Sequence, residues 1–318
     1  MVTTAAPAVI ATYTRSGFTE GLHFGHVVVV DPAGVVSRSW GDPDHVIFPR
    51  SSNKPAQATA MVRHGLDLPV HLLALSASSH SGERMHLAGV REILGAAGLD
   101  ESALQTPDDY PLDPMERDAW IADGRRAAPI AMNCSGKHAA MLATCVINDW
   151  PTQTYRDAAH PLQQAIRWQL EALAGEPVGH VGVDGCGAPV MSLTLTGLAR
   201  SLSRAVQGEP DEPGRRVTSA MAAFPDFVGG SNRDVTAFMR AVPGLVAKDG
   251  AEGVYVAALR DGTAIAIKSE DGSDRARQVA LATVLVGLGA DPDPLAHLRT
   301  IPLSGGGAIV GEVSSPLG

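Results

Sequence analysis

The segment VYVAALRDGTAIAIKS, residues 254–269, decides the fold because it carries two strands and the turn that joins them. An Asp-Gly dipeptide separates two runs of small and apolar residues, and Asp-Gly in this setting is a strong β-hairpin signal. In the second run, alternation places Ala264, Ala266 and Lys268 on one face of the strand. The two alanines leave room beside the sheet. We therefore expect a hairpin that presents the amine of Lys268 at its end.

The remaining strands are expected at the two ends of the chain. The segment GHVVVVDPAGVVSRSW, residues 25–40, predicts a second hairpin around its Asp-Pro-Ala-Gly turn. The segment GAIVGEV, residues 307–313, predicts a last strand. The middle of the chain is typical of helices, which we place at residues 55–65, 84–98, 135–149, 160–175 and 273–289.

This distribution of elements predicts an α+β protein with a single domain over residues 1–318. Strands from the N-terminal and C-terminal parts would pair in one mostly antiparallel sheet, and the helices would pack on it. The alternation and the capping residues support the individual elements more strongly than they support the topology.

Composition excludes several classes of protein. The chain has 318 residues, of which 45% are hydrophobic and 19% charged, as in soluble globular proteins. The net charge of −9, without a basic run, excludes nucleic acid as an expected partner. The longest apolar run, at 279–290, is too short to span a membrane. Without a signal-peptide pattern, and with three scattered cysteines, we expect a cytoplasmic protein without a disulfide framework.

Lysine is rare in this chain and draws attention to four positions, Lys54, Lys137, Lys248 and Lys268. Arginine stays protonated under ordinary conditions, whereas a buried lysine can lose its proton and act as a base. A chain that uses arginine almost everywhere else therefore singles out these four residues as candidates for chemistry. The alternative is that some of these lysines are leftovers of a composition bias.

The first candidate site pairs Ser51 with Lys54, three residues later. At a helix start, residues three apart lie on one face, so the lysine amine can reach the serine hydroxyl. A neutral lysine could accept the hydroxyl proton and make the serine a nucleophile. The alternative is a plain helix N-terminus, with Ser51 as the cap and Pro55 in the first turn.

Two further stretches offer polar groups. The segment SASSHSGE, residues 76–83, follows an apolar run and brings together serines, a histidine and a glutamate; its alternative is a polar turn. Lys268, at the end of its strand, could point at a bound ligand, or it could be a solvated edge-strand lysine. We expect Lys248 to be solvated.

The last candidate site combines NCSGKHA, residues 133–139, with VDGCGAP, residues 183–189. Each stretch places a cysteine in a glycine-containing turn. Thiolates from Cys134 and Cys186, with a neutral amine from Lys137, could hold zinc, although lysine is an unusual ligand and a Cys-x-x-Cys pair is missing. We expect Cys145, on an apolar helix face, to belong to the core.

The order of these sites resembles two families. A Ser-x-x-Lys pair, then a serine motif, then a strand lysine is the order in penicillin-recognising serine hydrolases. In this chain SHS replaces S-x-N and KSE replaces K-T-G. These departures from the pattern disfavour a β-lactamase proper. The stretches EGLHFGHVVVVDPAG, RSSNKPAQA, SSHSGE, NCSGKHAAML, VDGCGAP and IAIKSEDG together look like the asparaginase II family, the Rhizobium etli type of L-asparaginase.

The second resemblance covers about residues 8–311 and implies a β-lactamase-like fold, a homodimer and hydrolysis of L-asparagine to aspartate and ammonia. The resemblance implies catalytic roles for four residues of this chain. Ser51 matches the nucleophile, Lys54 its base, Ser79 a second serine and Lys268 the amine paired with it. Three further positions, Cys134, Lys137 and Cys186, match residues that hold a zinc ion.

The resemblance also places Asp184 close to the metal. From the chemistry, we expect Arg50 and His80 to contact the substrate, with Asp184 near it. A glycine, an alanine and a proline follow Cys186, where the family commonly has a larger residue, and this leaves asparagine versus glutamine open. The rival predictions are a β-lactamase-like serine amidase or glutaminase, and a non-catalytic protein that binds zinc or a small molecule.

Overall fold

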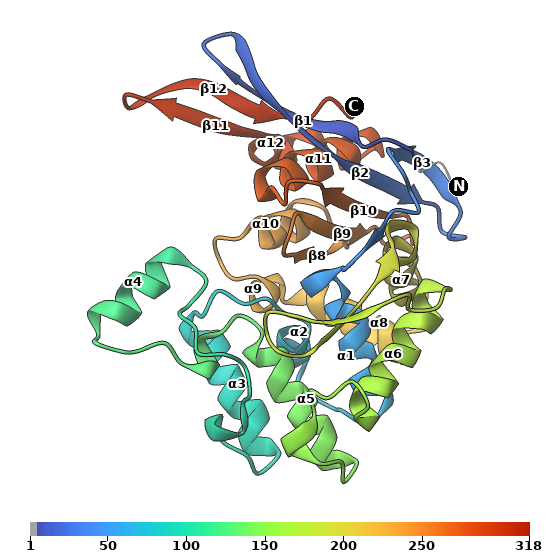
Figure 1. Ribbon diagram of the computed structural model, residues 1–318, viewed down its shortest axis with the longest axis vertical. Coiled ribbons are helices and arrows are strands. Elements are labelled where there is room, and N and C mark those ends of the chain that lie inside the picture. The colour runs from blue at the N-terminus through green and yellow to red at the C-terminus, as the bar shows by residue number, and fades with distance from the viewer. Residues whose placement is uncertain (1–4) are drawn as a thin grey trace.

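The computed structural model describes residues 5–318 (Figure 1). The expected absence of a signal peptide rests partly on residues 1–4, which lie outside the described residues. Twelve strands are present in the described residues: β1 (Ala8–Arg15), β2 (Phe18–Val30), β3 (Val36–Trp40), β4 (Val46–Ile47), β5 (Val181–Val183), β6 (Pro189–Met191), β7 (Leu193–Thr194), β8 (Val246–Gly250), β9 (Val254–Ala258), β10 (Ala264–Ser269), β11 (Thr300–Gly305) and β12 (Ala308–Ser314).

One eight-stranded antiparallel sheet organises the fold. Its order is β11-β12-β1-β2-β10-β9-β8, and β3 also pairs with β2. The expected central hairpin is present as β9 and β10, with Ile267 opposite Tyr255, and β10 also pairs with β2 along its length. The short pairs β4–β7 and β5–β6 lie outside this sheet. Strands from both ends of the chain thus meet in one sheet, and the predicted α+β class is confirmed.

Twelve α-helices lie in the described residues: α1 (Lys54–Arg63), α2 (Val70–Ser76), α3 (Arg84–Ala96), α4 (Pro114–Ala122), α5 (Ser135–Ile147), α6 (Pro161–Ala174), α7 (Leu195–Gln207), α8 (Pro213–Ala223), α9 (Pro225–Val228), α10 (Asp234–Ala241), α11 (Asp274–Gly287) and α12 (Pro292–Arg299). Four 3₁₀ helices complete them: η1 (Arg50–Asn53), η2 (Glu101–Ala103), η3 (Pro129–Ala131) and η4 (Thr152–Thr154). The five helices expected from the sequence are confirmed as α1, α3, α5, α6 and α11.

The two faces of the sheet are covered by different helices. Helix α7 packs against β2, β9 and β10, and α11 packs against β1, β10 and β12. The alternation in β10 supplies small or apolar side chains to both faces, since Ala264 and Ile265 are both buried. Figure 1 shows the β1–β2 and β11–β12 hairpins extending away from the helices, while α4 stands apart on another side. Across the described residues, the helices fall short of the length and apolarity needed to cross a membrane.

The edge strand β8 brings the sheet to the candidate site. It packs against η1, and a side chain at Gly250 would place its Cβ only 2.6 Å from the carbonyl oxygen of Pro49. That distance is shorter than a carbon–oxygen contact allows, so glycine is required for this approach. Strand β8 was missed by the sequence analysis because all five of its residues are buried, and such a short run lacks alternation.

Candidate active site

A cavity of about 190 Å³ lies where η1, β8 and the loop after α2 meet. Ser51 and Ser79, from two of the predicted sites, both line it. The other lining residues are Leu112, Asn133, Arg233, Asp249, Gly250, Ala251, Asp274 and Arg277. The serines come from segments 28 residues apart in the chain, so the cavity is created by tertiary packing.

Ser51 lies next to a strained backbone position. Arg50 has a φ of 52°, a left-handed conformation that residues with a side chain rarely adopt. Strain of this kind costs of order 1–3 kcal/mol and is often found at functional sites. The chain enters η1 from this turn, which leaves Ser51 partly exposed at the cavity wall, while Ser52 is buried.

Lys54 is 1% exposed. Its amine forms a hydrogen bond with Ser79 and not with Ser51. Its Nζ donates hydrogen bonds to Ser79 Oγ at 3.0 Å, to the Ser78 carbonyl and to Cys134 Sγ at 3.1 Å. Among residues 5–318, it makes no hydrogen bond to Ser51. Contacts between catalytic groups commonly tighten only when substrate is bound, so the geometry leaves Ser51 within the candidate site.

Lys268 does not reach the serines. Its Nζ donates to the carbonyl oxygens of Glu252 at 2.6 Å and Ser269 at 2.5 Å, and it does not line the cavity described above. The strand register explains this, since Lys268 lies opposite His26 on β2 and Val254 on β9, away from β8 at the cavity. The structure therefore does not form the predicted couple of Ser79 with Lys268.

The prediction that Lys248 is solvated is wrong. Lys248 lies on β8, is 0% exposed and donates to the Asp249 carboxylate at 2.5 Å. Burial lowers its pKa to about 8, against the attraction of Asp249 and with the repulsion of Lys54. Residues 248–250 read Lys-Asp-Gly at the end of a strand, which matches K-T-G at the lysine and the glycine and has aspartate in place of threonine. That tripeptide was the signal the sequence analysis overlooked.

Asp249 holds the cationic groups of the cavity together. Its carboxylate accepts from Lys248 and from Arg233 Nη2 at 2.5 Å, and Arg277 Nη2 lies 3.8 Å away. Burial opposes ionisation, but these three cations hold the pKa of Asp249 well below its usual value. The carboxylate is therefore ionised and shared among three positive groups.

His80 directly follows the cavity-lining Ser79 and is buried. Its ring is fully buried, with Nε2 2.8 Å from Ser135 Oγ and Nδ1 accepting from the Gly82 N–H. Burial, with the charges of His86 and Lys54, lowers the pKa of His80 well below its usual value, so the ring is neutral. It is absent from the residues that line the cavity, and direct contact of His80 with substrate stays a prediction.

Arg50 and Asp184 form an ion pair at the rim of the cysteine cluster. Arg50 Nε donates to Asp184 Oδ1 at 2.7 Å, and Arg50 Nη1 lies 3.7 Å from Glu252. Burial alone would raise the pKa of Asp184, but Arg50, Lys137 and the Gly185 N–H hold it below its usual value. The two residues expected to bind substrate are thus brought together, where each neutralises the other.

The three predicted zinc ligands meet in one buried cluster. Cys134, Lys137 and Cys186 are each 3% exposed or less, and Lys137 Nζ lies 3.2 Å from Cys186 Sγ. A hydrogen bond from Cys186 lowers the pKa of Cys134 well below its usual value, against burial and with help from Lys54 and Lys137. That hydrogen bond and burial together raise the pKa of Cys186. Burial would lower the pKa of Lys137, but the two cysteines and Asp184 raise it.

This donor set fits a zinc ion. A thiolate, a second sulfur and an amine nitrogen converge, and sulfur and nitrogen are the ligands that zinc prefers. The protonated amine of Lys137 supplies a positive charge beside the two sulfurs, and a bound metal ion could supply that charge instead. Cys145 lies apart from the cluster, fully buried, and burial raises its pKa to about 12.

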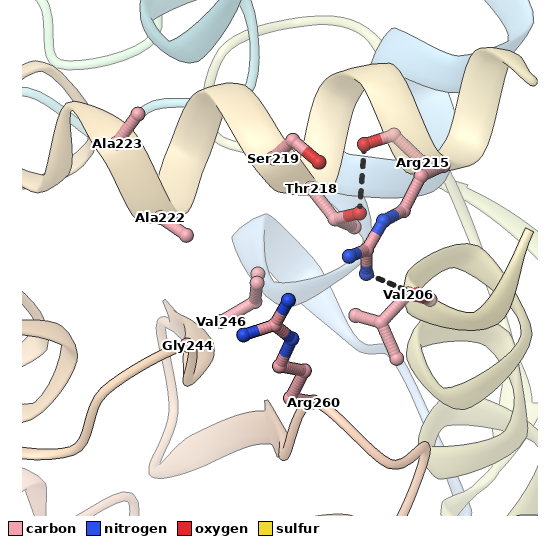
Figure 2. A pocket seen from close by; sticks show the side chains of 9 residues that line it. All are labelled: Val206, Arg215, Thr218, Ser219, Ala222, Ala223, Gly244, Val246 and Arg260. Atoms are coloured by element: carbon pink, nitrogen blue, oxygen red, sulfur yellow. Dashed lines mark hydrogen bonds between the residues drawn. The ribbon is translucent and has the colours of Figure 1, made fainter. Parts of the chain in front are cut away.

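A larger cavity lies elsewhere, at the side of α8. It has a volume of about 300 Å³, and Figure 2 shows the side chains of Arg215 and Arg260 extending into it. Arg215 is tied to the carbonyl of Val206. None of the predicted site residues lines this cavity, so it is separate from the serine pair.

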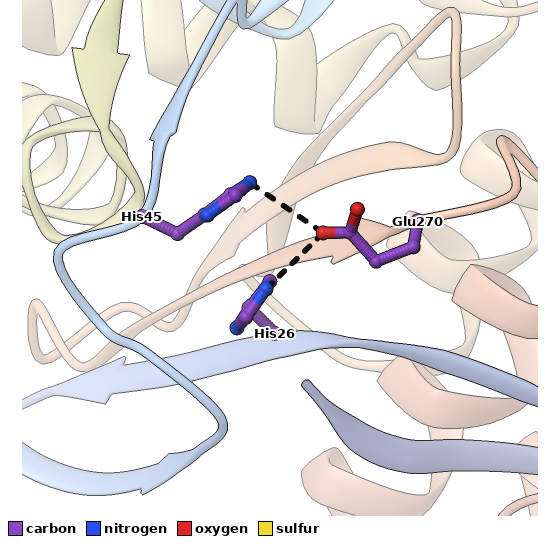
Figure 3. Close-up of side chains that lie close together, drawn as sticks. All are labelled: His26, His45 and Glu270. Carbon is purple, nitrogen blue, oxygen red and sulfur yellow. Dashed lines mark ion pairs between the residues drawn. The ribbon is translucent and has the colours of Figure 1, made fainter. Parts of the chain in front are cut away.

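A histidine–carboxylate cluster lies beside Lys268 and was missed by the sequence analysis. Figure 3 shows His26 and His45 directed at Glu270, whose Oε1 lies 3.1 and 3.5 Å from their Nε2 atoms. The backbone N–H of Asp42 donates to His26 Nδ1 at 2.8 Å. A neutral His26 therefore carries its proton on Nε2, and binding a metal there would break the Asp42 hydrogen bond. The neutral His26 thus donates from Nε2 to Glu270, and the cluster is a hydrogen-bonded group within the fold.

With this geometry established, comparison with known families identifies the chain. The family model described as L-asparaginase II matches residues 11–315, which is nearly the whole chain. The protein belongs to the L-asparaginase II family, and the family resemblance inferred from the motifs is confirmed. Membership supports an amidohydrolase. No curated protein matches the chain at a significant level.

Solved structures with a similar arrangement are distant in sequence. A β-lactamase from Mycobacterium bovis is 16% identical, with a TM-score of 0.47; the match covers 84% of this chain and 95% of that one. A native form of a protein called Mglu is 14% identical, with a TM-score of 0.45 and coverages of 85% and 66%. A Bacillus glutaminase is 14% identical, with a TM-score of 0.42 and coverages of 79% and 84%. At these identities and scores, the likenesses do not identify an activity.

Proposed function

We propose that the protein hydrolyses the side-chain amide of L-asparagine to L-aspartate and ammonia. The observation that carries this proposal is that Ser51 and Ser79 line one small cavity and that two buried lysines adjoin it, with Lys54 bonded to Ser79 and Lys248 bonded to Asp249. The inner cavity of about 190 Å³ is of a size for a small substrate such as a free amino acid.

Ser51 is the proposed nucleophile. Its hydroxyl oxygen attacks the amide carbon, and the hydroxyl proton passes to a neutral amine of the Lys54 and Lys248 group. Two ammonium groups close together in a buried site repel, which favours loss of one proton. The lowered pKa of Lys248, about 8, supports it in this role in place of Lys268.

The carbonyl oxygen becomes negatively charged in the tetrahedral intermediate and needs hydrogen-bond donors. Ser51 and Ala251 both line the cavity, and their backbone N–H groups have no backbone acceptor within residues 5–318. They are our candidates for this oxyanion site. Collapse of the intermediate breaks the carbon–nitrogen bond, a proton transferred through Ser79 gives ammonia, and a water molecule then cleaves the serine ester.

Zinc is part of the proposal as a resident ion held by Cys134, Lys137 and Cys186. A bound zinc would supply a positive charge beside the cavity, next to the Arg50–Asp184 pair. The protein side chains carry the steps above without it. We also propose that the active form is a homodimer, as in the family that the motifs resemble.

Ammonia release tests the function directly. Purified protein is assayed with L-asparagine, L-glutamine and a chromogenic β-lactam, beside Ser51→Ala. We expect ammonia from L-asparagine and none from the variant. Faster turnover of glutamine or of the β-lactam would support the rival amidases. Ligand binding without any turnover would support a non-catalytic binding protein.

A further inference from the structure

A guanidinium stands at the cavity with a hydrogen-bonding edge that the described protein does not use. Arg233 precedes α10, and its Nη2 donates to Asp249. Its Nη1 is buried and has no hydrogen-bond partner among residues 5–318. A buried donor left without a partner is costly, by about 1–3 kcal/mol, so such a group is expected to bind something. Arg277 donates to two carbonyls and pairs with Asp274, and its buried Nε likewise has no partner among residues 5–318.

The unpartnered edge of Arg233 suits an anion. Asp249 is the carboxylate bonded to Arg233, but Lys248 and Arg277 share it. Asp274 is a second carboxylate on this wall and pairs with Arg277, so the charges here largely balance, and the place for an anion is the free Nη1 of Arg233. A small carboxylate would give that donor an acceptor, although the molecule as a whole, with a net charge of −9, repels anions.

A carboxylate that can bind a positively charged group lies on the same wall of the cavity. Asp274 begins α11, and its Oδ1 accepts from Arg277 at 2.8 Å. Its side chain is 76% exposed, which leaves the second oxygen available. Arg233 and Asp274 also line a wider cleft of about 400 Å³ that shares Leu112 with the inner cavity. They thus stand where the inner cavity opens, and the two serines lie inside it.

We infer that Arg233 binds the α-carboxylate of the substrate and Asp274 its α-ammonium group, so that the side-chain amide points at Ser51. The inference rests on the proposed function and makes the site selective for free amino acids. An amide that lacks either α-group would lose one anchor. Arg50 and Asp184 do not line the inner cavity, where these two anchors lie.

Three small ligands distinguish the contribution of Arg233 to binding from that of Asp274. L-Asparagine carries both α-groups, succinamate lacks the ammonium group, and β-alaninamide lacks the carboxylate. Affinities are measured by calorimetry in a Ser51→Ala background, where turnover is blocked. We expect Arg233→Gln to weaken L-asparagine and succinamate by about 100-fold and to leave β-alaninamide unchanged, because only the first two lose a charged partner. Asp274→Asn should weaken L-asparagine but not succinamate.

Arg233→Lys separates a binding role from a structural one. Lysine keeps the charge but not the forked geometry, so it should restore part of the affinity for L-asparagine. The inference is overturned if Arg233→Gln weakens β-alaninamide as much as L-asparagine, which would indicate collapse of Asp249, or if it weakens neither. Binding of L-aspartate that depends on Arg233, with no ammonia from wild type, would sink the proposed hydrolysis while keeping the anchor.

Discussion

The amine of Lys54 lies 3.0 Å from the hydroxyl oxygen of Ser79, although 25 residues separate the two along the chain. Helix α1 carries the lysine inward, and the loop after α2 returns the serine to it. The hydroxyl of Ser51, three residues before Lys54, lies on the cavity wall instead. The lysine therefore links Ser79 to the cysteine cluster through its contact with Cys134.

Replacing Ser51 by alanine should lower kcat on L-asparagine by at least about 1,000-fold, because the acyl intermediate loses its attachment point. Ammonia release under saturating substrate measures this. Ser219, exposed at the separate cavity of Figure 2, provides the matched control. Equal activity of Ser51→Ala and Ser219→Ala would remove Ser51 from the nucleophile role.

Lys248 and Lys268 should differ sharply when each is replaced by methionine. Lys248→Met removes an amine beside Asp249 and should cut kcat by about 100-fold or more, the range of general acid–base catalysis. Lys268→Met removes an amine bonded only to carbonyls and should keep activity within a few-fold. Steady-state kinetics of both variants, with thermal melts to confirm folding, decides between them. Loss confined to Lys268→Met would restore the original pairing.

The wild-type activity should rise as pH increases through about 8, since the neutral form of Lys248 is the base and its pKa is lowered to about 8. The folded chain then binds fewer protons than the unfolded one between about pH 8 and 10.5. The free energy of unfolding should therefore also gain from this group as pH rises over that window. A pH profile of kcat/KM and urea melts at several pH values measure the two effects. A flat rate profile from pH 7 to 9 contradicts the assignment.

Cys186→Ser should lower bound zinc from about one ion per chain to a small fraction, because a thiolate ligand is replaced by a weak one. Metal analysis of protein purified without chelator gives the content. Cys145→Ser is the matched control, since Cys145 is equally buried but remote from Lys137. Similar zinc in both variants would count against the proposed ligands.

Gly250→Ala should inactivate the enzyme and destabilise it by about 1–3 kcal/mol, the usual cost of overpacking. The new Cβ would lie 2.6 Å from the Pro49 carbonyl and 3.2 Å from the Ser52 nitrogen, both backbone atoms that cannot rotate away. Gly95→Ala, on α3 with open space around it, should instead stabilise the protein slightly. Thermal denaturation and ammonia assays on both variants provide the comparison.

The sequence predicted those elements whose signals are local. Asp-Gly between two runs predicted β9 and β10, and Pro161 with Gly175 predicted the ends of α6, where Gly175 has a φ of 75°. Strand β8 left no comparable signal because it is buried on both faces. Its Lys-Asp-Gly tripeptide could have been recognised, but the strand itself could not be inferred from alternation.

Residue chemistry and order along the chain were sufficient to select Ser51 with Lys54 and the three metal-ligand candidates, because a rare lysine or cysteine is visible in any sequence. The choice of Ser79 within its serine-rich stretch came from the resemblance to a known family. Tertiary structure alone decided that Lys248 and not Lys268 approaches Lys54, and that Arg233 faces the same cavity. The reason is that strand order and register, set by packing between distant segments, determine which buried charges come together. A motif at one place in the sequence carries no information about the distance between two other motifs in the folded protein.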